Sequence, residues 1–257
     1  MTPATKRIGI SLVIYLAWIA ITLFGARLVA SGETTLTELV GTRIGWHFGI
    51  AIVLLLIAIA VFRWGDMHFT KPHAVLRIMW FPVIYLILYA GLVIYVGLPP
   101  FDFVFFVAIN TLLVGVSEEI MFRGILFRAF EPVMSIWPAI ILTSCLFGAM
   151  HTLNVLITGE LSAALLQSIA AGMSGVVFVA IVIRTGSIWP AIIYHFLWDC
   201  LIFLAAGVAH KSAPAVSAEE SGTMFMYVPI VLNLPNLIFA LFLLRKVGKQ
   251  DGELQMT

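Results

Sequence analysis

The sequence predicts an all-α protein, a polytopic transmembrane helix bundle of about eight spans with both termini in the cytoplasm. The first observation behind this prediction is composition, because 62% of the 257 residues are hydrophobic and only 11% are charged. A soluble domain carries about 25% charged residues. The second is a series of long apolar segments, and the third is the placement of lysine and arginine between them. We expect residues 1–257 to form one integral-membrane domain.

The apolar segments are separated by short polar or proline-containing breaks, and most are long enough to cross a bilayer as a helix. The gaps between them are too short to hold a soluble domain. The predicted segments span residues 8–30, 44–62, 75–97, 102–128, 137–153, 161–184, 187–208 and 225–245.

The basic residues set the expected orientation of the bundle. With eight spans and a cytoplasmic N-terminus, only Arg27, Arg43 and Lys211 of the 14 lysines and arginines lie on the outer side. The other eleven face the cytoplasm, as the positive-inside rule requires. We therefore predict a multi-pass protein of the plasma (inner) membrane, surrounded by lipid. No basic patch points to a nucleic-acid partner.

The segment 102–128 contains two adjacent carboxylates and an arginine. Ionisable side chains inside a span are costly, and by default they mark a functional site that faces the bundle interior. Glu119 and Arg123 are four residues apart and share a helix face, so we expect them to pair. Glu118 points about 100° away from Glu119 and is directed elsewhere. The alternative is that all three side chains form one ion network that holds the helices together.

Two later segments each carry a polar pair at helical spacing. Phe147 and His151 are four residues apart, as are His195 and Asp199, so each pair shares a face. A lone intramembrane histidine such as His151 often serves only as a hydrogen-bonding group. The His195–Asp199 pair fits a structural hydrogen bond, half of a metal site or a catalytic pair.

The depths of these residues in the membrane favour one shared site. At 1.5 Å per residue, Glu118 lies about 15 Å and His195 about 12 Å from the cytoplasmic helix ends. Asp199 lies about 18 Å and His151 about 20 Å deep by the same measure. Four costly side chains from three helices thus reach a similar layer, which a common function explains most simply.

The chemistry that fits such a site is hydrolysis. A buried carboxylate such as Glu118 can act as a general base, with His151 assisting a water and His195 and Asp199 opposite. No serine or cysteine is clearly paired with a histidine, so covalent catalysis is less favoured. The His-Glu-x-x-His zinc-protease signature is absent. His47 lies near a predicted interface, where we expect it to be solvated.

The three clusters, Glu-Glu-x-x-x-Arg at 118–123, Phe-x-x-x-His at 147–151 and His-x-x-x-Asp at 195–199, resemble the motifs of the CPBP family. That family contains type II CAAX prenyl endopeptidases and bacteriocin-processing or immunity-type membrane proteases. The resemblance implies an intramembrane endopeptidase with a motif-bearing catalytic core at 102–208 and a site open toward the cytoplasm.

The resemblance also implies a role for each residue of the three motifs. Glu118 is the catalytic glutamate, His151 the assisting histidine, and His195 with Asp199 the oxyanion-side pair. Supporting positions fall on Glu119, Arg123 and Phe147. The prenyl endopeptidases usually carry asparagine where this chain has Asp199, and an ionised aspartate cannot donate a hydrogen bond to an oxyanion. Asp199 must therefore be protonated, bind a metal or orient His195.

The sequence does not decide the cofactor or the substrate, and it leaves two competing functions open. Zn²⁺ or another divalent metal held by Glu118, His151, His195 and Asp199 is one prediction, a metalloprotease. A metal-free glutamate mechanism is the alternative. The expected substrate is a CAAX-type prenylated tail, or a leader or membrane peptide. A non-catalytic immunity or scaffold protein and a proton- or metal-coupled transporter are the competing functions, although the inverted repeats typical of transporters are not evident.

Overall fold

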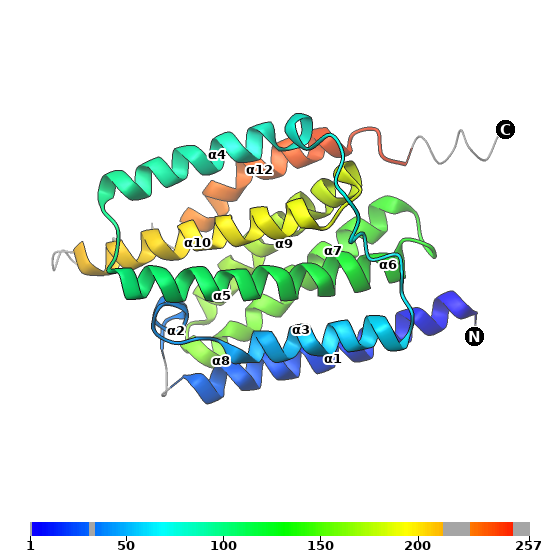
Figure 1. The fold of residues 1–257 in the computed structure, drawn as a ribbon, viewed down its shortest axis with the longest axis horizontal. Helices are drawn as coiled ribbons and strands as arrows, with labels where there is room; N and C mark the ends of the chain where they lie inside the picture. Colours follow the sequence, from blue (N-terminus) through cyan, green and yellow to red (C-terminus); the bar gives the residue numbers. More distant parts are fainter. Residues whose placement is uncertain (1, 31–33, 213–226, 249–257) are drawn as a thin grey trace.

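The computed structural model describes residues 2–30, 34–212 and 227–248, with only the backbone for 209–212, and this part of the chain is helical without any strand. Lys249 and residues 225–226 of the last predicted segment lie outside it. Figure 1 shows the helices running along a common direction as a bundle. Their bounds are α1 Pro3–Val29, α2 Leu36–Thr42, α3 Trp46–Val61, α4 Val75–Val96, α5 Phe101–Glu119, the π-helix η1 Ile120–Leu126, α6 Phe127–Phe130, α7 Ile136–His151, the 3-10 turn η2 Thr152–Asn154, α8 Val155–Thr158, α9 Leu161–Thr185, α10 Trp189–Ser212 and α12 Val228–Leu244.

All eight predicted segments coincide with helix, which confirms the all-α prediction. Six helices in the described part are long and apolar enough to cross a membrane. A seventh would be α2 with α3, but this pair is bent by 84°. The last helix, α12, is apolar but only 17 residues long. The exact number of spans and the cytoplasmic termini therefore stay predictions.

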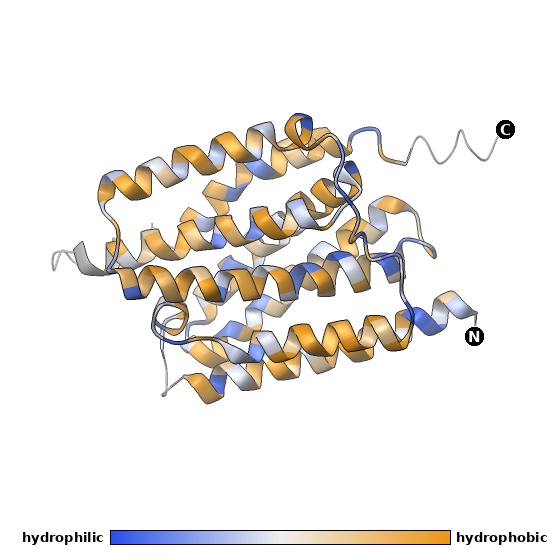
Figure 2. Ribbon diagram, in the orientation of Figure 1, coloured by the Kyte–Doolittle hydropathy of each residue, from blue (hydrophilic) through white to orange (hydrophobic). Residues whose placement is uncertain are grey.

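The outer surface of the bundle is apolar. Leu28, Leu76 and Tyr95 are 87%, 90% and 89% exposed, and Figure 2 shows apolar residues along most helices. Such a surface would promote association in water but suits contact with lipid. Glu118 and Arg123, in contrast, are buried inside the bundle. Apolar groups outside and ionisable groups inside are typical of a membrane bundle with an internal site.

One end of the bundle is held together by ion pairs and hydrogen bonds of arginine side chains, and we call it the basic end. Arg7 donates hydrogen bonds of 2.7 and 2.9 Å to Asp66, and Arg128 Nε lies 3.7 Å from the same carboxylate. Arg184 Nε donates to the backbone oxygen of Leu243 at 2.7 Å. The start of α1, the α3–α4 connection, the end of α6 and the ends of α9 and α12 therefore meet here.

The ion pairs of the basic end predict a pH dependence. Partial burial would raise the pKa of Asp66, but hydrogen bonds and charge from Arg7, with the charge of Arg128, hold it below the ordinary 3.8. A carboxylate whose pKa is lower in the folded than in the unfolded state stabilises the fold at pH values above its unfolded pKa. This stabilisation is lost as the pH falls through the pKa of the folded state. We expect the melting temperature in detergent to fall between about pH 6 and about pH 3, and to fall less in Asp66→Asn. Equal slopes for the two proteins would refute this role.

The opposite end, which we call the α2 end, contains the bend between α2 and α3. Asn110 of α5 donates hydrogen bonds to the backbone oxygens of Val40 at 2.7 Å and Arg43 at 2.6 Å. Its side-chain oxygen accepts a hydrogen bond from the Gly45 N–H at 2.7 Å. One buried amide thus satisfies three backbone groups that the bend removes from helical hydrogen bonding, and it fixes α2 to α5.

Helices α7 and α9 cross closely at two glycines, and these differ in how much space they leave. A Cβ added at Gly148 would lie 2.6 Å from the backbone oxygen of Ser168, whereas one at Gly172 would lie 3.7 Å from that of Ser144. We expect Gly148→Ala to push the helices apart and to cost about 1–3 kcal/mol. Gly172→Ala makes only ordinary contacts and is the matched control. Thermal unfolding in detergent measures both, and equal melting temperatures would contradict the close packing at Gly148.

Candidate active site

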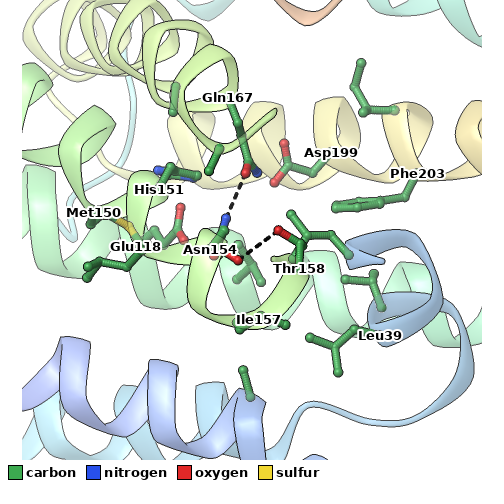
Figure 3. Close-up of a pocket in the computed structure, with 18 of the residues that line it drawn as sticks. Leu39, Glu118, Met150, His151, Asn154, Ile157, Thr158, Gln167, Asp199 and Phe203 are labelled. Atoms are coloured by element: carbon green, nitrogen blue, oxygen red, sulfur yellow. Dashed lines mark hydrogen bonds between the residues drawn. The ribbon is translucent and has the colours of Figure 1, made fainter. Parts of the chain in front are cut away.

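A cavity of about 750 Å³ lies inside the bundle, and all four predicted site residues line it. Glu118 comes from α5, His151 from the end of α7, and His195 and Asp199 from α10. Figure 3 shows Glu118, His151 and Asp199 around this space. Phe147 also lines it. The prediction that three helices bring these polar residues together is confirmed as geometry.

Beneath the cavity lies a fully buried ion network. Arg123 Nη1 donates to Glu119 Oε1 at 3.0 Å, and Nη2 donates to the backbone oxygen of Gly175 on α9 at 3.2 Å. The guanidinium also lies 4.4 Å from the Phe147 ring and 4.9 Å from the Phe178 ring. The predicted Glu119–Arg123 pair is therefore confirmed. Neither of its side chains lines the cavity, so the pair supports the site from behind.

His195 connects this network to the cavity. Its Nδ1 lies 2.8 Å from Glu119 Oε1, an oxygen that also accepts from Arg123, so Nδ1 is the protonated nitrogen. The other nitrogen, Nε2, faces Asp199 Oδ2 at 3.3 Å and Glu118 Oε2 at 3.6 Å. Two carboxylates beside one ring nitrogen repel each other unless a proton is held among the three groups. The cluster can therefore store and deliver a proton.

His151 and Glu118 line the same cavity, and each has a polar atom without a strong partner in the described part of the chain. His151 Nδ1 lies 2.8 Å from the backbone oxygen of Phe147, which can only accept, so Nδ1 donates and Nε2 keeps its lone pair. Glu118 Oε2 is buried and makes no hydrogen bond within the described part of the chain. A buried unpaired oxygen is costly and calls for a partner. The Glu118 carboxyl and the His151 ring are therefore the groups of this cavity that could hold a water or a substrate group.

The donors do not form a metal site as they lie here. Within the described residues, no group of three or more histidine, cysteine, aspartate or glutamate side chains is placed to hold a metal ion. The zinc set predicted from the sequence therefore stays a prediction.

The first three helices contribute to the site in ways that the sequence did not indicate. Trp18 Nε1 donates to Ser117 Oγ at 2.8 Å, which places α1 directly beside Glu118. His47 on α3 is only 6% exposed and lines the cavity, and neither ring nitrogen has a partner in the described part. The expectation of a solvated His47 is wrong. Gly25 of α1 allows this burial, because a Cβ there would lie 2.1 Å from His47 Cβ.

Amide side chains form another part of the cavity wall. Asn154 Nδ2 donates to Gln167 Oε1 at 2.8 Å, as the dashed line in Figure 3 shows, and Ser174 Oγ donates to Asn233 Oδ1 at 2.7 Å. All four residues line the cavity. Intramembrane amides at these spacings suggest only structural hydrogen bonds between helices. The structure contains these hydrogen bonds, but that they lie on the cavity wall follows from the tertiary fold and not from the spacing of the residues.

Comparison with known proteins gives one match. Residues 100–201 match the family model described as type II CAAX prenyl endopeptidase Rce1-like. The matched range contains all three polar clusters and begins after α4 ends. No curated protein and no solved structure matches the chain.

Proposed function

Residues 100–201 belong to the CPBP family of CAAX-type membrane proteases, and from this premise we propose that the protein is an intramembrane endopeptidase. The proposed reaction is hydrolysis of a peptide bond in a membrane-associated substrate, with a water activated by Glu118 and His151. The observation that carries the proposal is that Glu118 and His151 line the same cavity, while Glu118 Oε2 makes no hydrogen bond in the described part of the chain. A general base must be able to reach the water that it deprotonates.

In the proposed first step, Glu118 takes a proton from the water while the water oxygen bonds to the carbonyl carbon of the peptide. His151 Nε2 accepts a hydrogen bond from the same water, because its tautomer is fixed by the Phe147 carbonyl. The tetrahedral intermediate then collapses, the C–N bond breaks, and Glu118 returns the proton to the leaving nitrogen. Atoms and charge balance without a further reactant.

The proposed role of His195 and Asp199 is to stabilise the oxyanion of that intermediate. Their 3.3 Å contact allows a shared proton, so that the pair can present an N–H or O–H donor to the negative oxygen. Glu119 holds the His195 ring from the other side at 2.8 Å and fixes its orientation. In this scheme Asp199 acts as a protonated or orienting partner.

The direct test is cleavage by the purified protein in liposomes. A prenylated CAAX-type peptide and a leader-type membrane peptide are incubated with it in ¹⁸O-labelled water. We expect one class to yield two fragments, with ¹⁸O in the new carboxylate, because hydrolysis takes that oxygen from water. A folded protein that cleaves neither class would favour the immunity or scaffold function instead. Proton or metal flux without cleavage would favour a transporter.

Metal content is a separate prediction. Because the histidine and carboxylate side chains of the cavity form no three-residue metal set in the described part of the chain, we expect no stoichiometric zinc and cleavage that survives chelation. Elemental analysis of the detergent-purified protein beside His151→Ala measures this. Near one zinc per chain, lost in His151→Ala, would instead establish a metalloprotease and make Asp199 a candidate ligand.

A further inference from the structure

The cavity extends in only one direction from the layer of Glu118 and His195. On α5, the residues that line the cavity are Val114 and Glu118. None of the described residues that follow Glu118 in α5, η1 and α6 lines it. On α10, the lining begins at His195 and continues toward the C-terminal part of the helix as far as Phe203. Both directions lead to the α2 end of the bundle.

On the other side of this layer the bundle is filled. This region contains side chains that are at most 1% exposed and that come from η1, α6, the α3–α4 connection and the α9–α10 connection. They include Met67, Met121, Phe122, Phe127 and Ile188. None of them lines the cavity. In the described part of the chain, packed side chains thus separate the site from the basic end.

The cavity reaches the surface at the α2 end. Thr35 and Glu38 of the α2 segment, and Glu160 and Ala163 at the start of α9, line the cavity and are exposed. We call these four residues the rim. Phe103 of α5 fixes the elements around it, because a Cβ on Gly41 of α2 or on Gly207 of α10 would lie 2.0 or 2.6 Å from its ring. Figure 1 shows α2 and the N-terminus at opposite ends.

The charges of the two ends differ strongly. Of the Lys and Arg side chains that the structure describes, only Arg27 and Arg43 lie toward the α2 end. Arg123 is buried in mid-bundle, and nine others lie toward the basic end, namely Lys6, Arg7, Arg63, Lys71, Arg77, Arg128, Arg184, Arg245 and Lys246. The positive-inside rule places the basic end in the cytoplasm. The rim then lies on the non-cytoplasmic side.

We infer that the cavity admits its substrate from the α2 end, on the non-cytoplasmic side of the membrane, and that the substrate is a peptide segment presented there. The inference rests on the proposed function, because the peptide that enters the cavity is a substrate only if the protein cleaves it. It reverses the cytoplasmic access that the family resemblance implies. A prenylated tail that stays in the cytoplasm would meet the filled side of the bundle, whereas an exported or membrane-anchored peptide would meet the rim.

The wall between the rim and the site suits an extended peptide. Figure 3 shows Asn154, Gln167 and Thr158 around the same space as Glu118 and His151. Amide and hydroxyl groups can exchange their mutual hydrogen bonds for bonds to a peptide backbone, which must be satisfied away from water. A peptide entering from the rim would therefore find partners before it reaches Glu118.

Cysteine accessibility tests the direction of access without relying on cleavage. Cys145 and Cys200 are first replaced by alanine, because both are free thiols and Cys145 is exposed. Single cysteines are then placed at Met150 beside His151 in the cavity, at Ala163 on the rim, and at Lys71 at the basic end as the control. Each variant is treated with a small membrane-impermeant thiol reagent in right-side-out and in inverted vesicles.

We expect Met150→Cys and Ala163→Cys to react in right-side-out vesicles and to lose this reaction in inverted ones, and Lys71→Cys to show the reverse. Reaction of Met150→Cys from the cytoplasmic face would overturn the inference, whichever side labels Ala163→Cys. Cleavage assays leave these outcomes unchanged. An inactive protein with outward labelling would refute the proposed enzyme alone, and an active protein with inward labelling would refute the direction alone.

Discussion

Replacing Glu118 by glutamine should abolish cleavage and leave the protein folded. Glutamine keeps the shape of the side chain but cannot accept the proton of the attacking water, and a general base contributes about 10²–10⁴-fold to the rate. Glu118 Oε2 makes no hydrogen bond in the described part of the chain, and Asp199 adds a second carboxylate within reach of the same histidine. Removing a buried negative charge therefore costs the fold little, and we expect an unchanged or higher melting temperature.

The neighbouring glutamate provides the matched control. Glu119→Gln is the same chemical change one residue further along α5, but Glu119 accepts from Arg123 and contacts His195. It should lower both activity and melting temperature, whereas Glu118→Gln should lower activity alone. Cleavage of a peptide in liposomes and thermal unfolding in detergent give the two readouts. Undiminished cleavage by Glu118→Gln would refute the proposed base, and a drop in melting temperature equal to that of Glu119→Gln would assign Glu118 to the structural network.

The contacts that could be predicted from the sequence are those set by helical spacing. Residues four apart on a helix share a face, so the Glu119–Arg123 and His195–Asp199 contacts follow once the segments are known to be helical. The cost of burying ionisable groups in lipid then predicts that they face inward to a common site. The helical segments themselves follow from length and hydropathy.

The contacts that could not be predicted join parts of the chain that are far apart. Trp18 and Ser117 are 99 residues apart, and no local pattern indicates that this hydrogen bond places α1 beside Glu118. The burial of His47 depends on the 84° bend before α3, which Asn110 stabilises from another helix. The π-helical turn of η1 also leaves no sequence signal, because π-helices depend on context and occur mostly as short insertions at functional sites.

The second large effect should come from Arg123. Arg123→Ala removes the permanently charged partner of Glu119, and it empties the space between the Phe147 and Phe178 rings. Breaking a buried ion pair by deleting one partner costs about 3–5 kcal/mol. We therefore expect a larger fall in melting temperature for Arg123→Ala than for Glu119→Gln or Gly148→Ala. Arg123→Lys should recover only part of the loss, because a lysine cannot bond Glu119 and the Gly175 carbonyl with one planar group.

A double variant separates the structural and the positioning roles of this pair. In Glu119→Gln/Arg123→Met both charges are removed and the volume is largely kept, a change that is often neutral or stabilising for a buried pair. We expect most of the melting temperature to return. Cleavage should stay low, because His195 Nδ1 loses the carboxylate that fixes its tautomer and its orientation toward Asp199. Recovery of both stability and cleavage would show that the Glu119–Arg123 pair only holds the helices together, and that His195 is positioned by its stacking on Phe178 at 4.4 Å.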